Sequence, residues 1–142
     1  MSEPLKGLKG RVPPQNIDAE RALLGSIMLK SDAIHDATDI INPESFYVEK
    51  HRTVFRAMLD LMNGGSPIDL LSLGNRLKEV NELDRIGGNA FLAELAAEVP
   101  SSANLKYYAE IVQKKSMMRN LIEAAAEITE LGYDESQDIE TL

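Results

Sequence analysis

The chain has 142 residues, of which 44% are apolar and 27% are charged, so it is long enough to bury a core and its composition excludes wholesale disorder. It contains no Cys, which excludes disulfide bonds and thiolate zinc sites and is typical of a reducing, cytoplasmic compartment. Its net charge of -8 opposes binding to phosphate backbones, so we expect a protein partner rather than nucleic acid.

The N-terminal residues carry no targeting pattern. No apolar run in the sequence approaches the roughly 18 to 20 residues that cross a bilayer, and residues 1–10 lack the apolar segment of a signal peptide. We therefore expect neither membrane insertion nor export. Residues 1–12 are predicted to be a flexible tail, after which Pro13 and Pro14 each fix one φ angle and give an ordered lead into the first helix.

The first helix is predicted from Ile17 to Leu29. Asn16 is placed to cap it, and Asp18 lies near the positive end of the helix dipole. Gly25 in this helix is predicted to permit close helix packing rather than to bind a ligand.

The next two helices follow from the same kinds of signal. Ser31 and Asp32 can cap a short helix, which ends before Pro43 because proline disfavours helical backbone in the residue before it. Apolar residues then recur at helical spacing in HRTVFRAMLDLMN, and the following Gly-Gly pair supplies the positive φ angles that end helices.

Asp69 is predicted to cap a fourth helix over LLSLGNRLKEV. Gly74 inside this helix costs about 1 kcal/mol relative to Ala. Residues 83–86 are predicted to close a loop, and Asn89 to cap a fifth helix that Pro100 ends. The expected buried stripe of the fourth helix is Leu70, Leu73, Leu77 and Val80.

One long helix is predicted from Ser101 or Ser102 to Gly132, because no proline and no internal glycine interrupts this stretch. A polar loop and the first turn of a further helix, capped by Ser136, should follow, and we infer a truncated helical hairpin. The apolar residues of the long helix cover more of its circumference than one core-facing stripe requires, so we expect a second partner. They are Leu105, Tyr108, Ile111, Val112, Met117, Met118, Leu121, Ile122, Ala125, Ile128 and Leu131.

No alternating strand pattern and no internal repeat occurs, so the predicted fold class is all-α. Three parts are expected along the chain. A flexible tail spans residues 1–12 and a helical head spans residues 13–100. Residues 101–142 hold the long helix and the start of the hairpin, whose second helix is expected to be absent.

The sequence favours no catalytic or metal site. His35 lies among Asp32, Asp36 and Asp39, but this spacing is typical of a solvated helix face, which leaves a metal site with His51 as a minor alternative. P-loop, dinucleotide and nucleophile motifs are absent, so we expect no catalysis and no cofactor in this chain.

The basic cluster Lys114, Lys115 and Arg119 lies in the long helix, where four Lys and Arg are balanced by four Glu. A solvated face that pairs charges across a dimer therefore explains it better than a nucleic-acid site.

Four blocks carry a family resemblance: PPQNIDAERALLGSIML, INPESFYVEKHRTVFRAM, PIDLLSLGNRL and LDRIGGNAFLAELAAEVPSSANLKYYAEIVQKKSMMRNLI. In this order and spacing they resemble the N-terminal domain of bacterial replicative DNA helicases of the DnaB family. The resemblance runs from about Arg11 to the chain end. Phe91 replaces a more usual Tyr, and Gly74 is unusual for the family.

The resemblance implies a helical head followed by a long hairpin that pairs with its counterpart in another subunit. Such dimers would assemble as a trimer of dimers above a ring of ATPase domains, and ATP and Mg belong to that motor domain, which we expect this chain to lack. It also implies docking of the C-terminal domain of the primase, and a helicase loader is a further candidate partner. The parent would act in the cytoplasm, at the bacterial replication fork.

The resemblance also implies particular contact residues. Asp18, Phe91, Ile122 and Ile128 are the primase-contact candidates, although each also fits packing within the chain or, for Asp18, a dipole-pairing charge. Two other functions stay open, namely a stand-alone all-α adaptor or helicase-loading or regulatory factor, and an enzyme with a metal on its histidines. The candidates for the subunit interface are Tyr108, Ile111, Val112, Lys115, Met118, Arg119 and Ala125.

Overall fold

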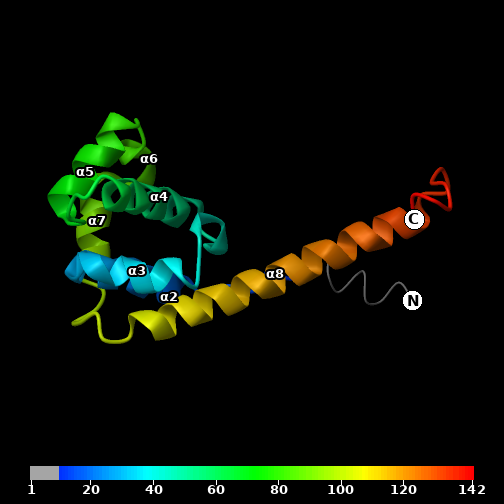
Figure 1. The fold of residues 1–142 in the computed structure, drawn as a ribbon, viewed down its shortest axis with the longest axis horizontal. Coiled ribbons are helices and arrows are strands. Elements are labelled where there is room, and N and C mark those ends of the chain that lie inside the picture. Colours follow the sequence, from blue (N-terminus) through cyan, green and yellow to red (C-terminus); the bar gives the residue numbers. More distant parts are fainter. Residues whose placement is uncertain (1–9) are drawn as a thin grey trace. The chain divides into compact units, whose positions relative to one another are not determined.

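The computed structural model describes residues 10–142, and every regular element in this range is helical (Figure 1). The all-α fold class is therefore confirmed. None of the helices in this part of the chain is both long and apolar enough to span a membrane. In chain order the elements are α2 (Ile17–Leu29), the short 3-10 helix η1 (Ser31–Ala33), α3 (Ile34–Thr38), a second 3-10 helix η2 (Pro43–Ser45), α4 (Glu49–Asn63), α5 (Leu70–Glu79), α6 (Leu83–Ile86), α7 (Gly88–Ala96) and α8 (Leu105–Tyr133).

The described chain forms two compact units. Residues 15–116 form the head, and residues 10–14 and 117–142 belong to the second unit. The division therefore falls inside α8, whereas the sequence prediction placed a boundary at residue 100. The difference has a physical cause, because Leu105, Ala109 and Val112 in the first turns of α8 are buried in the core of the head.

Helix α2 has the bounds that the sequence predicts, because its cap is local. The side chain of Asn16 accepts a hydrogen bond from the backbone N–H of Ala19 at 2.9 Å, and Asp18 lies in the first turn. The predicted close packing at Gly25 is also confirmed. A Cβ atom there would collide with the carbonyl oxygen of Leu95 in α7, so only glycine lets the two helices approach this closely.

Helices α5 and α7 also meet at a glycine. A Cβ atom at Gly74 would lie 2.6 Å from Oδ1 of Asn89. The predicted capping role of Asn89 is wrong, because α7 already begins at Gly88. Gly87 precedes it with a φ of 106°, and no side chain caps the helix.

Other element boundaries differ from the prediction. The short second helix is divided into η1 and α3, and the predicted loop at residues 83–86 is the one-turn helix α6. Helix α7 ends at Ala96, before Pro100, and α8 begins only at Leu105. The four-residue length of α6 is the reason it was missed, since one turn carries no periodic pattern.

The core of the head is aliphatic with a few aromatic rings. Its largest fully buried side chains include Phe46, Phe55, Leu23, Leu24 and Ile27. The predicted stripe of α5 is only partly confirmed, because Leu73 and Leu77 are fully buried whereas Leu70 and Val80 are exposed.

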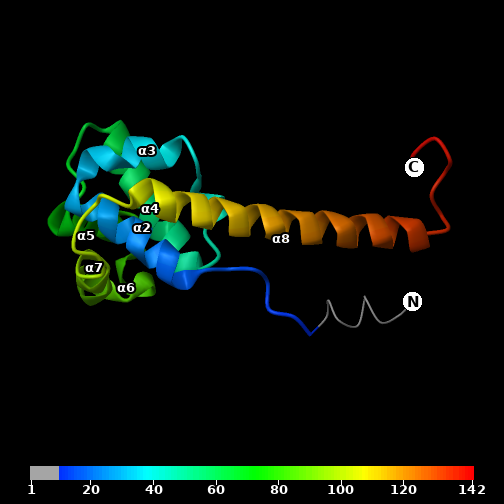
Figure 2. The ribbon, with the colours of Figure 1, turned by 90° about the horizontal axis from the view of Figure 1, so that it is seen from below.

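Helix α8 is unbroken from Leu105 to Tyr133 and includes Gly132 (Figure 2). Among residues 134–142 no further helix begins, so the predicted capping role of Ser136 is wrong. Instead the Asp134 carboxylate accepts hydrogen bonds from Nε2 of Gln137 at 2.9 Å, from the hydroxyl of Ser136 at 2.6 Å and from the backbone N–H of Ser136 at 3.0 Å. These bonds favour the ionised carboxylate and lower the pKa of Asp134.

Candidate interaction surface

The second half of α8 carries large apolar side chains that the described chain leaves uncovered. Leu121 is 70% exposed, Ile128 is 69% exposed and Ile122 is 42% exposed. Together with Met117, Met118, Ala125 and Leu131 they recur at intervals of one, three and four along the helix, so the seven residues share one broad side of it. We call this set the α8 apolar surface: Met117, Met118, Leu121, Ile122, Ala125, Ile128 and Leu131.

Such a contiguous set differs from scattered exposed apolar residues, which are normal on any protein. A continuous apolar surface on a helix is a candidate interaction site, because water is displaced from all of it when one partner binds. Met117 and Met118 add adaptable side chains that pack against varied shapes. The geometry therefore fits another helix better than a small ligand.

The arm of residues 10–14 is bonded to this part of α8. Nη1 of Arg119 donates to the carbonyl oxygen of Pro14 at 2.7 Å, and both residues are half-buried. The two prolines therefore present a fixed carbonyl acceptor to the helix. Arg119, a predicted interface residue, has this partner within its own chain.

A buried carboxylate and imidazole join α2 to α4. Glu20 and His51 are each 1% exposed, and Nδ1 of His51 lies 2.8 Å from Oε1 of Glu20. The carboxylate also accepts from the backbone N–H groups of Tyr47 at 2.7 Å and Val48 at 3.3 Å. Glu20 thus satisfies N–H groups at the start of α4 that the helix itself leaves unpaired.

Phe91 completes this cluster from α7. Its ring stacks on His51 with centroids 6.0 Å apart and an interplanar angle of 12°. Nζ of Lys50 lies 4.2 Å from the Phe91 centroid, within the range of a cation–π contact. The cluster is a packing centre of the head.

Residues 12–114 match the family described as the DnaB-like helicase N terminal domain. The chain belongs to the DnaB helicase family. Over 135 residues it is 40% identical to the replicative DNA helicase DnaC of Bacillus subtilis, an alignment that covers 95% of this chain and 30% of that relative. The chain thus spans less than a third of the length of this DnaB-family helicase.

Solved structures of DnaB-family proteins agree with the fold. The N-terminal domain of DnaB helicase from Mycobacterium tuberculosis superposes with a TM-score of 0.88 at 38% identity, over 92% of each chain. A structure described as a DnaB-like replicative helicase and its interactions with primase gives a TM-score of 0.73 at 34% identity, over 81% of this chain and 27% of that one.

The primase-contact candidates occupy different environments in this DnaB-family domain. Asp18 is exposed in the first turn of α2, and Ile122 and Ile128 belong to the α8 apolar surface. Phe91 is only 5% exposed and packs on His51. The contact assignment of Phe91 stays a prediction, and we place only the exposed candidates in the proposed docking surface.

The subunit-interface candidates also differ in how far they are exposed. Met118 and Ala125 are exposed, whereas Tyr108, Ile111 and Lys115 are half-buried. Val112 is 1% exposed and lies in the core of the head, so among the candidates it is the least accessible to a partner. Helical spacing alone places Val112 beside Tyr108 and Ile111, and it gives no information on which turns of α8 the head covers.

The sequence interpretation missed the Glu20–His51 pair. A signal was present, because Glu20 lies four residues before Leu24 and therefore on the buried side of α2. A carboxylate on such a side requires a partner. Within residues 10–142 no group of three or more His, Cys, Asp or Glu side chains is placed to hold a metal, and His35 is exposed.

Proposed function

We propose that this chain is the oligomerisation and primase-docking domain of a replicative DNA helicase. The α8 apolar surface carries the proposal, because burial of apolar area contributes about 25 cal/mol per Å² and a second copy of the same helix offers a matching surface. In the parent protein, ATP-dependent unwinding with Mg would belong to a motor domain outside this chain. The parent would work in the bacterial cytoplasm at the replication fork.

Primase docking is supported by a different observation. A structural neighbour at 34% identity is described with its interactions with primase. Asp18, Ile122 and Ile128 are exposed here and so can contact a partner directly. The docking surface that we propose contains these three residues.

Sedimentation velocity over a concentration series tests self-association of this chain. We expect a concentration-dependent dimer or larger species in the wild type. Leu121→Glu should shift the chain to the monomer, because a carboxylate at a buried apolar contact loses its hydration without gaining a partner. The monomeric variant should keep the helical circular dichroism of the wild type.

Leu71→Glu is the matched control, because Leu71 is also an exposed leucine but lies on α5, outside the α8 apolar surface. It should sediment like the wild type. A wild-type chain that stays monomeric at high concentration would contradict the oligomerisation proposal. Dissociation by Leu71→Glu but not by Leu121→Glu would move the pairing surface to α5.

A further inference from the structure

Charge is distributed unevenly along this chain. Residues 120–142 contain seven acidic residues and no Lys or Arg, so this stretch carries nearly all of the net charge of -8. Carboxylates near the C-terminal end of a helix oppose the helix dipole, and the last turn of α8 contains no basic residue. Cations from outside this stretch would therefore stabilise the second half of α8. The acidic residues of that half are Glu123, Glu127 and Glu130.

These three glutamates are exposed and share one side of α8 with Arg119. They follow Arg119 at intervals of four, four and three residues, which bring residues of a helix onto one side. We call the side formed by the three glutamates the α8 acidic side. At 3.6 residues per turn it lies opposite the α8 apolar surface. A segment bound to the α8 acidic side therefore leaves the residues proposed for self-association uncovered.

The arm of residues 10–14 meets α8 at the start of this side. Nη1 of Arg119 donates to the carbonyl oxygen of Pro14 at 2.7 Å, and the arm belongs to the same compact unit as residues 117–142. The two prolines of the arm limit its backbone conformations, so the preceding chain leaves Arg119 in a restricted set of directions. Arg11 is the first cation before these prolines and is exposed. The arm thus brings the basic N-terminal end of the chain to the α8 acidic side.

We propose that the basic N-terminal segment, residues 1–11, binds in cis along the α8 acidic side. This segment contains three Lys and Arg and one acidic residue, so its charge is opposite to that of residues 120–142. Residues 1–9 of it lie outside the range that the structure describes. Attachment through Pro14 gives the segment a high effective concentration beside α8, which favours the chain's own segment over that of a second copy. Bound there, it offsets the unfavourable charge and stabilises the helix that presents the α8 apolar surface.

The length of the segment agrees with this occupant. From Arg119 to Glu130, helix α8 rises roughly 16 Å. The chain from Pro14 back to Lys9 spans up to roughly 17 Å when extended, so Lys9 is within reach of each glutamate of the α8 acidic side. Lys6 lies three residues further along and reaches the same glutamates without full extension. Both lysines can therefore contact the α8 acidic side while the bond at Pro14 is kept.

Paramagnetic broadening in solution NMR tests this contact. The chain contains no Cys, so Ser2→Cys carries a single nitroxide label. With the labelled, isotope-enriched chain diluted into an excess of unlabelled, unenriched chain, only contacts in cis are observed. We expect broadening of the amide signals of Glu123, Glu127 and Glu130 at low salt. Raising the salt concentration to about 0.5 M should remove most of it, because the screening length then falls below the distance over which exposed charges attract.

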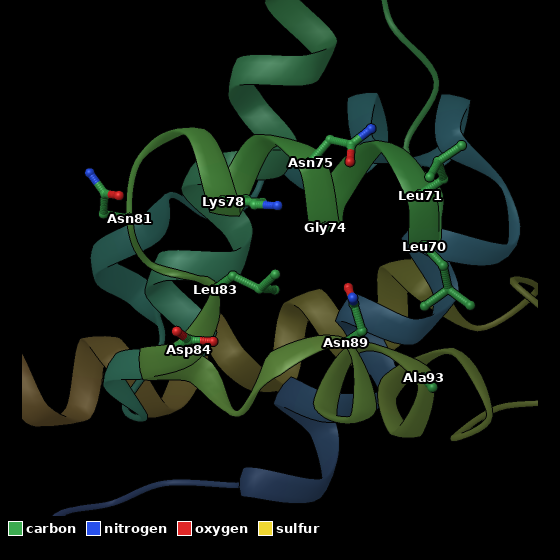
Figure 3. A pocket seen from close by; sticks show the side chains of 10 residues that line it. All are labelled: Leu70, Leu71, Gly74, Asn75, Lys78, Asn81, Leu83, Asp84, Asn89 and Ala93. Atoms are coloured by element: carbon green, nitrogen blue, oxygen red, sulfur yellow. The ribbon is translucent and has the colours of Figure 1, made fainter.

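Charge reversals in this labelled chain have a matched control. Lys6→Glu combined with Lys9→Glu should reduce the broadening at least about threefold, because repulsion replaces attraction. Lys30→Glu combined with Lys78→Glu makes the same change of net charge on exposed positions of the head and should keep the wild-type broadening. Lys78 points into the space between α5 and α7, away from α8 residues of the second unit (Figure 3). Circular dichroism melts establish that both double variants are folded.

Three outcomes would overturn the proposal. The first is the absence of broadening on α8 at low salt, and the second is equal loss of broadening in the two double variants, which would mean that net charge alone acts. The third is broadening only when the nitroxide and the isotopes are on different chains, which would place the segment on a second copy. Self-association is measured separately by sedimentation, so its failure and the failure of this proposal are distinguishable.

Discussion

At the scale of single residues, Glu20 shows how the head accommodates a charged group in its core. The carboxylate is buried together with His51, and it accepts hydrogen bonds from the backbone at Tyr47 and Val48. Each of these partners offsets part of the cost of removing the carboxylate from water. No buried side-chain nitrogen or oxygen in the described residues lacks a hydrogen-bond partner.

Glu20→Gln should therefore lower the free energy of unfolding by about 2 to 3 kcal/mol, because the amide offers one acceptor where the carboxylate offers two. Urea unfolding followed by circular dichroism measures the change. Glu123→Gln, the same substitution at an exposed position of α8, should change stability by less than about 0.5 kcal/mol. Equal effects of the two substitutions would show that the Glu20 contacts contribute little.

At the scale of elements, the helices whose caps are local were predicted correctly from the sequence. Asn16 begins α2 at the predicted residue, and Asp69 begins α5 by accepting from the backbone N–H of Ser72 at 2.9 Å. Asn89 shows the limit of this reasoning. It has the type of a capping residue, but tertiary packing against Gly74 in α5 places its side chain elsewhere.

Asp69 gives a prediction for α5 as a whole. Hydrogen bonds from Ser72 lower the pKa of Asp69, so its charge stabilises the fold above the usual carboxyl pKa of 3.8. This stabilisation is lost as the pH falls through the lowered value. Asp69→Ala should cost about 1 kcal/mol at neutral pH, whereas Asp69→Asn should keep the cap.

Thermal melts between about pH 7 and pH 2 measure this difference, and the melting temperature of the wild type should fall relative to that of Asp69→Asn only in the acid range. Parallel curves for the two proteins down to the lowest pH would contradict the role of the charge.

The α8 apolar surface could be predicted from the sequence only in part, because tertiary packing decides which turns of α8 are covered. The excess of apolar residues in α8 correctly indicated exposed positions such as Leu121 and Ile128. Which turns belong to the core of the head depends on tertiary packing, and the sequence therefore did not reveal that Val112 is buried there. Phe91 shows the same limit, because an aromatic residue suits both a core and an interface, and the sequence does not reveal that its ring packs on His51.

At the scale of the whole molecule, the question is whether a partner protein recognises this domain by particular contacts or only by its net negative charge. If Asp18 contacts primase as we propose, Asp18→Lys should weaken capture of the primase C-terminal domain at least about fivefold without changing the sedimentation of this chain, because it reverses the charge at that position. Surface plasmon resonance against that domain measures the effect. Asp36→Lys makes the same change of net charge at another exposed position. Equal weakening by both would mean that long-range electrostatics, and not a contact at Asp18, governs capture.

The bond between Arg119 and Pro14 also bears on how the chain folds. It joins residues 105 positions apart in the sequence, at 2.7 Å. Closing a loop of that length in an unfolded chain has a high entropic cost for one hydrogen bond. The bond therefore forms only after the helices between its ends have shortened the loop, and it raises the contact order of a protein whose other contacts are mostly local. We expect this contact to form late, so Arg119→Gln should raise the unfolding rate and leave the folding rate nearly unchanged in stopped-flow urea experiments.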